Sequence, residues 1–302
     1  MIEFQKPDPR EREHYDTLLQ SCGKGCEYSF VNLSIWGRQR AAFLDGFLVL
    51  QSQFDRRSVY PFPVGKGDIL PVLKAVMCDA AQRGIPCCFT GMNQAECTVL
   101  DQLFPGKFYF QPDRNSFDYI YSIDDLADLK GRKFQKKRNH LNRFRENHPG
   151  WRTEPLSRDH LPAVREFAEA WYDRRLQTDP HGSYTLEKIA LERALREPDA
   201  LGLEGLVLLE NEQLLAFTLG SRLSADTYDV HFEKAREDVD GAYTAINQQF
   251  AFHLREKHPD VRFLDREEDM GLEGLRKAKL SYCPVRLVEK YWARLWEETD
   301  ED

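Results

Sequence analysis

One short segment of the sequence alternates charged and apolar side chains. Tyr228-Asp-Val-His-Phe-Glu-Lys234 has the pattern of a β-strand, in which every second side chain points to the same face. Asp229, His231 and Glu233 would then share one face. A histidine between two carboxylates suits proton transfer near neutral pH, so we expect these three residues to be catalytic. The exposed face of a half-buried strand has the same pattern, and that alternative stays open.

A group of acidic residues follows the next expected strand, which ends at Leu264. Asp265-Arg-Glu-Glu-Asp269 would form a loop at the carboxyl end of that strand, where ligands of open α/β sheets tend to bind. The carboxylates of Asp265, Glu267 and Glu268 would suit a cationic amino group. The alternative is an acidic cluster stabilised by the N-terminus of the following helix.

The third group is cationic. Residues 130–145 include eight basic residues and no acidic one, although the chain has a net charge of −8. Several of these cations recur at helical spacing and predict a cationic stripe, whose role would be to bind phosphate groups. The expected phosphate-binding residues are Arg132, Lys133, Lys136, Lys137, Arg138, His140 and Arg143. A solvated linker helix is the alternative.

The elements that must position these groups follow one order twice. In the N-terminal part we expect a helix at 11–20, strands at 41–45, 47–54 and 58–62, a helix at 67–84, a strand at 86–90, a helix at 93–103, and two closing strands within 107–121. In the C-terminal part we expect strands at 205–210, 213–223 and 227–234, a helix at 241–257, a strand at 261–264, a helix at 271–280 and a strand at 285–293.

The second half of each repeat keeps a nearly constant offset. The long helices, the next strands and the short helices are displaced by 174, 175 and 178 residues. We therefore expect an α/β fold with mixed sheets, made of a duplicated unit. The expected domains are 1–130 and 150–302, joined by a basic linker helix at 131–149. Chance repetition of common β and α elements is the alternative.

This order of elements resembles the GNAT acyltransferase fold, and two such units in tandem resemble the Fem-type aminoacyl transferases. Three segments are similar to the phosphatidylglycerol lysyltransferase C-terminal domain family: Leu129–Phe144, His231–Lys234 with Gly241–Gln248, and Arg266–Tyr282. The resemblance implies transfer of an aminoacyl group from aminoacyl-tRNA to a lipid or amine acceptor. It also implies that the basic helix binds tRNA or an anionic lipid head group. Further substrate-binding residues within these segments would be Arg266, Tyr243, Asn247 and Lys277.

Acyl-CoA is the alternative donor, and its expected binding loop is poorly preserved. GNAT enzymes place a glycine-rich loop at the N-terminus of the long helix, where backbone N–H groups bind pyrophosphate. In the first unit, Gly65-Lys-Gly67 keeps the glycines, which leaves a nucleotide-type ligand as an alternative. In the second, Asp238-Val-Asp-Gly241-Ala-Tyr243 places acids and a tyrosine there. A non-catalytic relative that only binds an anion is a further alternative.

The composition also indicates whether the protein is inserted in a membrane, is secreted or binds a metal. No stretch approaches the ~20 apolar residues of a membrane helix, and the first residues do not resemble a signal peptide. The seven cysteines are scattered, as in a reduced, cytoplasmic protein. Cys22 and Cys26 have half of a metal-site spacing without a second pair, so we expect no metal. No other cofactor is indicated, and the sequence does not predict an oligomeric state.

Overall fold

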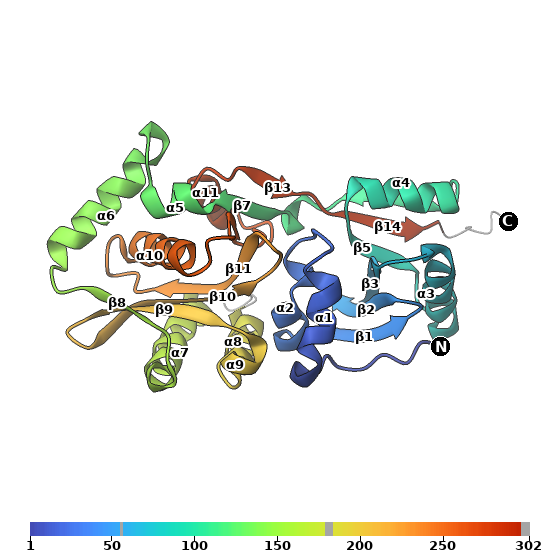
Figure 1. Ribbon diagram of the computed structural model, residues 1–302, viewed down its shortest axis with the longest axis horizontal. Coiled ribbons are helices and arrows are strands. Elements are labelled where there is room, and N and C mark those ends of the chain that lie inside the picture. The colour runs from blue at the N-terminus through green and yellow to red at the C-terminus, as the bar shows by residue number, and fades with distance from the viewer. Residues whose placement is uncertain (55–56, 179–183, 297–302) are drawn as a thin grey trace. The chain divides into compact units, whose positions relative to one another are not determined.

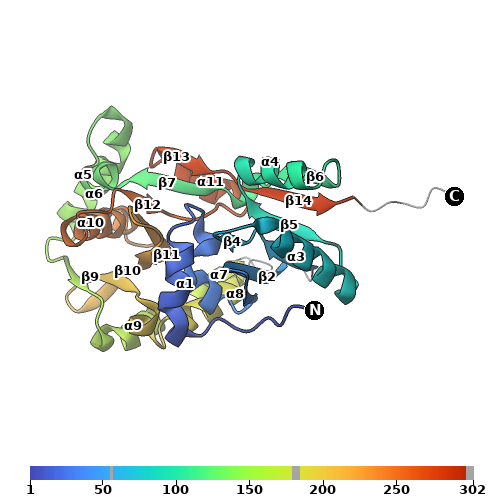
Figure 2. The same ribbon diagram turned by 45° about the vertical axis from the view of Figure 1, so that its right-hand side comes forward.

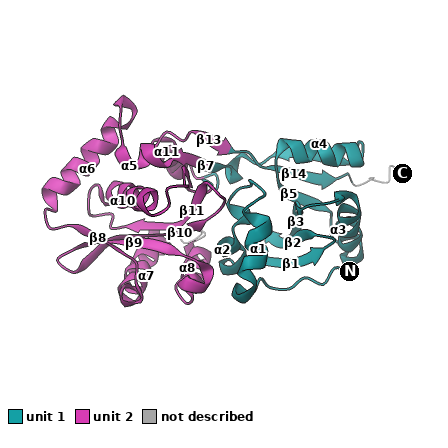
Figure 3. Ribbon diagram, viewed as in Figure 1, with its two compact units in different colours: residues 1–118, 268–271, 288–302 teal, residues 119–267, 272–287 magenta. Residues whose placement is uncertain are grey.

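The computed structural model describes residues 1–54, 57–178 and 184–296. Contacts divide the chain into two compact units that are not continuous in sequence (Figure 3). Unit 1 comprises residues 1–118, 268–271 and 288–302, and unit 2 comprises residues 119–267 and 272–287. Among the described residues, none of the helices has the length and hydropathy needed to cross a membrane.

Unit 1 is built on a mixed sheet. Its strands follow the order β1-β2-β3-β5-β14-β6, and β4 pairs with β2. Their bounds are β1 Gln39–Leu44, β2 Phe47–Phe54, β3 Arg57–Pro61, β4 Val64–Gly65, β5 Cys88–Met92, β6 Phe108–Pro112 and β14 Tyr291–Leu295. The pair β3–β5 is parallel, whereas β14 is antiparallel to both of its neighbours. Side chains of β2, β3 and β5 pack with α3 and α4 in one apolar core.

The helices of unit 1 begin and end where their sequences provide caps. They are α1 Arg12–Leu19, α2 Phe30–Ile35, α3 Ile69–Arg83 and α4 Gln94–Leu103, with short 3-10 turns at Pro9–Glu11, Cys26–Tyr28 and Arg114–Ser116. Asp68 accepts a hydrogen bond from the Leu70 amide at the start of α3, and Gly84 ends that helix at a φ of 66°. Asn93 and Glu96 form a capping box at the start of α4.

Unit 2 is built on a second mixed sheet with the order β13-β7-β12-β11-β10-β9-β8. The bounds are β7 Asp118–Ser122, β8 Arg152–Pro155, β9 Glu204–Glu210, β10 Gln213–Arg222, β11 Thr227–Ala235, β12 Phe263–Asp265 and β13 Arg286–Val288. Only the pair β11–β12 among those described is parallel. This sheet carries most of the expected site residues.

Helices cover both faces of the second sheet. They are α5 Ile123–Asp128, α6 Gln135–Asn147, α7 Leu161–Thr178, α8 Tyr184–Ala194, α9 Pro198–Leu201, α10 Ala242–Lys257 and α11 Glu273–Leu280, with 3-10 turns at Arg132–Phe134 and Arg158–His160. Figures 1 and 2 show α10 on one face and α7 and α8 on the other. Phe134, Leu141 and Phe144 anchor the α6 segment in the core around α10.

The expected α/β fold with two GNAT-like units and mixed sheets is confirmed, and the order of elements repeats as expected. Both hairpins turn at two residues of positive φ: Asp45 and Gly46 in unit 1, and Asn211 and Glu212 in unit 2. The helices α7 and α8, which lie between residues 150 and 205, were not predicted from the sequence. These helices give the second sheet its second covered face.

The last strands of the two halves differ from the expected arrangement. We expected both closing strands within 107–121 to complete the first unit. Instead β6 lies in the first sheet and β7 pairs with β12 in the second, while the C-terminal strand β14 fills the place between β5 and β6. Each sheet therefore takes one strand from the other half of the chain. The boundaries at residues 130 and 150 stay a prediction.

One glycine of unit 2 is needed for close packing of α6 against α10. Gly241 precedes α10 with a φ of 86°, and an added Cβ would lie 2.5 Å from the His140 carbonyl oxygen. We expect Gly241→Ala to lower the free energy of unfolding by about 2 kcal/mol or more, because strain and a backbone clash combine. Gly274→Ala is the control, since nothing lies within 4 Å of its added Cβ. Equal urea midpoints for the two variants would contradict the prediction.

Candidate functional site

Strand β11 carries the expected catalytic residues, but a β-bulge changes their arrangement. Leu219 of β10 pairs with Phe232 and Gly220 pairs with Val230, so His231 is the extra residue. Beyond the bulge the side chains exchange faces: Tyr228, Val230 and Ala235 all join the core around α10. The prediction that Asp229, His231 and Glu233 share one face is therefore wrong.

The alternative of an exposed strand face is wrong too, because β11 is buried along almost its whole length. The α10 face takes the core side chains, and the opposite face lies under the layer of α7 and α8. Sequence alternation alone could not reveal this, since α7 and α8 were not predicted. The charged side chains of β11 consequently lie inside the protein, where each needs a specific partner.

Asp229 and His231 form the first polar group of unit 2. His231 Nε2 lies 2.8 Å from Ser221 Oγ, and Nδ1 lies 3.3 Å from Glu267 Oε1 and 3.4 Å from Asp229 Oδ2. Ser221 is on β10 directly opposite Asp229, which explains its reach to the histidine. Ser221 was missed, because a serine within an apolar strand gives no signal. The two carboxylates can orient the imidazole of His231 so that it accepts a proton on the side of the Ser221 hydroxyl.

Glu233 belongs to a second group on the α10 face. Its side chain accepts hydrogen bonds from Arg266 at 2.7 Å and from Asn247 at 3.2 Å. The Arg266 guanidinium also lies 4.9 Å from the centroid of the Tyr282 ring. Although burial opposes it, the nearby Glu233 carboxylate helps to raise the pKa of Arg266. Glu233 is thus a partner of Arg266 and is poorly placed to accept a further proton.

Two buried polar atoms near Glu233 complete this group. Thr218 Oγ1 and Asn247 Oδ1 have no hydrogen-bond partner within the described part of the chain. Thr218 lies opposite Glu233 in the strand register. The amide nitrogen of Asn247 donates a hydrogen bond to Glu233. Buried polar atoms are usually paired with protein, water or ligand. The two atoms therefore mark a polar centre within the core of unit 2.

The acidic loop after β12 is divided between different environments. Asp265 accepts a hydrogen bond from the Glu267 amide at 2.8 Å, and Glu267 has a φ of 55° that turns it toward His231. Lys279 donates to the Glu267 carbonyl at 3.0 Å and fixes this turn. Glu268 belongs to unit 1 and lies beside Cys26. The structure therefore does not gather Asp265, Glu267 and Glu268 around one amino group.

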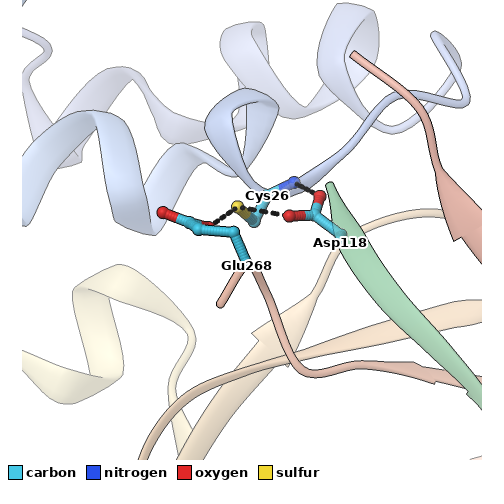
Figure 4. A group of neighbouring side chains, drawn as sticks. All are labelled: Cys26, Asp118 and Glu268. Atoms are coloured by element: carbon cyan, nitrogen blue, oxygen red, sulfur yellow. Dashed lines mark hydrogen bonds between the residues drawn. The ribbon is translucent and has the colours of Figure 1, made fainter. Parts of the chain in front are cut away.

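Unit 1 contains a charged cluster that was not predicted from the sequence. The Lys290 ammonium lies 2.8 Å from Asp118 Oδ1 and 2.6 Å from Glu27 Oε2. Figure 4 shows Cys26 between Asp118 and Glu268: its thiol lies 3.3 Å from one carboxylate and 3.2 Å from the other, and its amide donates to Asp118. These residues are distant in sequence, so no local spacing could have revealed them.

The electrostatics of this cluster favour a proton on Asp118. Burial raises the pKa of Asp118 to about 7, against the opposing effect of Lys290, and the carboxylates of Glu27 and Glu268 act in the same direction as burial. Lys290 stays charged, since the neighbouring carboxylates raise its pKa despite burial. One ammonium thus faces three carboxylates, of which Asp118 takes up a proton near neutral pH.

Two sets of side chains have the composition of metal ligands. In the described residues, ligand atoms lie within 4.8 Å of one another in the set Cys26, Asp118 and Glu268, and in the set Asp229, His231 and Glu267. In the first set the Lys290 ammonium already provides positive charge next to Asp118. In the second, the histidine is hydrogen bonded to Ser221 through its other nitrogen, as is usual for a metal-bound imidazole. Neither set requires a metal to explain its geometry.

The cations of residues 130–145 meet acids that lie elsewhere in the sequence. Lys133 pairs with Asp125 at 2.7 Å, while His140 and Arg143 both reach Asp240 at 3.1 and 3.0 Å. Arg138 donates to the carbonyls of residues 129 and 131. Arg132 and Lys136 form no ion pair within the described residues and stay exposed. The charge run is therefore partly balanced in space, though not in sequence.

The structure explains the residues of the two loops in which CoA binding was considered. Gly65 lies in β4, where an added Cβ would be 2.4 Å from the Gly46 carbonyl oxygen. Asp68 then places a carboxylate at the first amides of α3. At the other helix, Gly241 is packed against α6 and Asp240 is paired with Arg143. Both helix starts present carboxylates where pyrophosphate would bind.

The remaining expected residues lie at different depths. Tyr243 is partly buried against the core of unit 2, and burial raises its pKa to about 12. Lys277 forms an exposed ion pair with Glu273 on α11 at 2.7 Å. The role of each in substrate binding stays a prediction.

Solved structures share this fold over nearly the whole chain. A conserved protein of unknown function from Bacteroides thetaiotaomicron is 38% identical, with a TM-score of 0.92 and coverage of 98% of this chain and 100% of that one. L-PGS from Bacillus licheniformis is 17% identical, with a TM-score of 0.69 and coverage of 97% and 93%. A tandem GNAT protein from the clavulanic acid biosynthesis pathway is 9% identical, with a TM-score of 0.51 and coverage of 98% and 99%.

Sequence comparison adds a relative and a family. An uncharacterized protein of Mycoplasmoides gallisepticum is 26% identical over 185 residues, which are 60% of this chain and 57% of that protein. Residues 21–294 match the family described as phosphatidylglycerol lysyltransferase, C-terminal. The match includes both units and all the side chains discussed above. The chain therefore belongs to the phosphatidylglycerol lysyltransferase C-terminal family, whose domains have an acyltransferase-like fold.

Proposed function

We propose that the protein transfers an aminoacyl group from aminoacyl-tRNA to a hydroxyl or amine acceptor, with a lipid head group as the favoured acceptor. The family membership supports this donor. The carboxylates at the starts of α3 and α10 disfavour the pyrophosphate of acyl-CoA. Because aminoacyl-tRNA is a cytoplasmic substrate, we propose that the reaction takes place on the cytoplasmic side.

The observation that carries the proposal is the environment of His231. Its Nε2 lies 2.8 Å from Ser221 Oγ, while Nδ1 faces the carboxylates of Asp229 and Glu267. This arrangement stabilises an imidazolium once a proton has been accepted. Glu233, the other expected base, is already engaged by Arg266. His231 is consequently the favoured proton acceptor.

The reaction would then be an acyl transfer without a cofactor. The acceptor oxygen or nitrogen attacks the ester carbonyl of the aminoacyl-tRNA and loses its proton to His231. The tetrahedral intermediate then releases the ribose oxygen, which accepts that proton from His231. Asp229 and Glu267 hold the charged histidine in place between the two steps.

The test is transfer of a labelled amino acid by the full chain. Purified protein is mixed with charged tRNA and vesicles of phosphatidylglycerol, and with acetyl-CoA and an amine in a parallel reaction. We expect transfer from charged tRNA only, and a loss of 10²–10⁴-fold in His231→Gln. His253→Gln on α10 is the matched control. No transfer from any charged tRNA would reject the proposal, and acetyl transfer alone would select the acyl-CoA alternative.

The basic helix supplies the second part of the proposal. Arg132, in the 3-10 turn before α6, and Lys136, in α6, are exposed and form no ion pair among the described residues, so they are well placed to bind tRNA or lipid phosphates. We expect Arg132→Ala/Lys136→Ala to weaken retention of tRNA, with an effect that shrinks as salt rises. The same variant should keep its free energy of unfolding within ~0.5 kcal/mol of that of the unchanged protein. Unchanged retention at low salt would remove tRNA docking from α6.

A further inference from the structure

Three side chains of the types that bind metals meet inside unit 2. Asp229 and His231 are two residues apart on β11, and Glu267 follows β12, the parallel neighbour of β11. One ligand atom from each lies within 4.8 Å of the other two. The imidazole and the Asp229 carboxylate are almost completely buried, whereas the Glu267 side chain is 18% exposed. The group therefore borders solvent on the Glu267 side.

The distances within this group match those between neighbouring ligands of a zinc ion. His231 Nδ1 lies 3.3 Å from Glu267 Oε1 and 3.4 Å from Asp229 Oδ2. Charge-assisted hydrogen bonds between nitrogen and oxygen are shorter, at about 2.7–2.9 Å, and a single Nδ1 proton has to serve both carboxylates. Four-coordinate zinc binds nitrogen and oxygen at about 2.0–2.1 Å, which places neighbouring ligand atoms about 3.3 Å apart.

The ligands are held in position by further contacts. His231 Nε2 lies 2.8 Å from Ser221 Oγ, and metal-bound histidines nearly always bond their other ring nitrogen in this way. The Glu267 amide donates to Asp265 Oδ1 at 2.8 Å, and the φ of 55° at Glu267 turns its side chain toward His231. Such preorganisation favours binding, because few side chains have to be ordered when the ion arrives.

The types of ligand select the class of ion. An imidazole with two carboxylates suits zinc and similar transition metals, whereas magnesium and calcium prefer oxygen ligands alone. A divalent ion also neutralises both carboxylates, while one imidazolium neutralises a single charge. In the other set of possible ligands, the Lys290 ammonium lies 2.8 Å from Asp118 and 3.7 Å from Cys26 Sγ, where it repels a cation.

We propose that Asp229, His231 and Glu267 form a binding site for one divalent transition-metal ion, with zinc as the best-fitting ion and water as its fourth ligand. The ion binds the lone pair of Nδ1, so the ring hydrogen lies on Nε2 and is donated to Ser221 Oγ. In this form Nε2 cannot accept a proton. Zinc is therefore an inhibitor of the transfer reaction, and this consequence, unlike the site itself, rests on the proposed function.

The test is metal binding by the full chain after treatment with EDTA. Cobalt(II) is the probe, because four-coordinate cobalt has intense visible absorption bands and a cobalt–thiolate bond adds a near-ultraviolet band. We expect one cobalt ion per chain with four-coordinate bands, no thiolate band, and displacement by zinc, which binds such sites more tightly. These measurements use the unaltered protein and do not require a variant to fold.

Variants identify the ligands. We expect His231→Gln and Glu267→Gln to weaken zinc binding at least about 100-fold, and Ser221→Ala to weaken it about 10–100-fold, because Ser221 contacts only the bound histidine. His253→Gln on α10 is the matched control and should bind zinc as the unaltered chain does. Glu267→Gln keeps the size of a partly exposed side chain, so it tests the site even where replacement of the buried histidine prevents folding.

Each result supports or overturns the inference. Loss of cobalt binding in Glu267→Gln, with retention in His253→Gln, supports it. A thiolate band would assign the ion to Cys26 and overturn it, as would six-coordinate bands or no binding at millimolar cobalt. In the transfer assay, zinc should stop the reaction and EDTA should restore it. Absence of transfer under every condition would reject the proposed function alone, because the binding measurements contain no tRNA or acceptor.

Discussion

Deletion of residues 288–302 is expected to abolish the folding of unit 1. Strand β14 lies between β5 and β6 and pairs with both. Its removal would expose two strand edges in the middle of a sheet, together with the core around the fully buried Ala293. Lys290 would be lost as well, leaving the carboxylates of Asp118 and Glu27 without their counterion.

The effect should exceed that of any single substitution in the chain. Two rows of unpaired backbone groups and one layer of the core are lost together. We expect the deleted protein to lose most of its near-ultraviolet circular dichroism from unit 1 and to be cut by protease within residues 1–118. Deletion of residues 297–302 is the control, because β14 ends at Leu295.

The deletion also tests the domain boundaries expected from sequence. If residues 1–130 formed an independent domain, loss of the C-terminal segment would leave them folded. A protease-resistant fragment of residues 1–118 in the deleted protein would therefore contradict our prediction and support the sequential division. Destabilisation that reaches unit 1 would instead establish β14 as part of its fold.

Local sequence patterns predicted those elements whose signals are local. The caps of α3 and α4 and the two-residue turns of both hairpins depend on neighbouring residues, so they could be recognised. The partner of β14 depends on pairing between residues more than 200 positions apart, such as Ala293 with Phe89. A strand pattern indicates a strand and one buried face, but it does not specify the sheet that receives it.

In the candidate site too, side-chain positions depend on strand pairing that the local sequence does not specify. The sequence indicated His231 and the loop at residues 265–269 as separate groups, and the structure brings His231 beside Glu267 because β11 and β12 are adjacent and parallel. The sequence pattern misplaced Glu233, since one bulged residue reverses the faces of a strand. The bulge is a property of pairing between β10 and β11, and strict alternation in the sequence cannot reveal it.

The order of charges along the sequence likewise predicted only part of the surroundings of the basic helix. The basic helix has no acid between residues 130 and 145, yet Asp125 and Asp240 reach it from other elements. What distinguishes Lys137 from its neighbours is burial beside Arg266 and Tyr282. Function on this helix is therefore predicted from the surroundings of each cation, rather than from the number of cations.

The second large effect is expected at Lys290. Lys290→Met removes a buried ammonium that lies within 2.8 Å of two carboxylates. At pH 8 we expect the free energy of unfolding to fall by about 3–5 kcal/mol, because loss of one partner leaves uncompensated buried charge. Lys66→Met, at an exposed lysine of the same unit, is the control and should change little. Urea denaturation of each protein gives the comparison.

The size of this loss should depend on pH. In the folded chain the pKa of Asp118 is raised from 3.8 to about 7, so the folded state holds a proton that the unfolded state releases between these values. The contribution of Asp118 to stability is therefore greatest at low pH and declines as pH rises toward 7. Removing Lys290, which opposes that shift, makes the protonated form still more favoured.

The difference between Lys290→Met and the unchanged protein should consequently be smaller at pH 5, where Asp118 is protonated in both and only Glu27 loses its partner. It should grow as pH rises through 7 and 8, because the unchanged protein releases the Asp118 proton there while the variant, whose Asp118 pKa is higher still, retains it. Adding Asp118→Asn to Lys290→Met should recover part of the loss at pH 8, because the amide carries no charge and can still accept a hydrogen bond from the Cys26 amide. If the loss were the same at pH 5 and pH 8, Lys290 would stabilise unit 1 by packing alone, and the proton assigned to Asp118 would have to lie elsewhere.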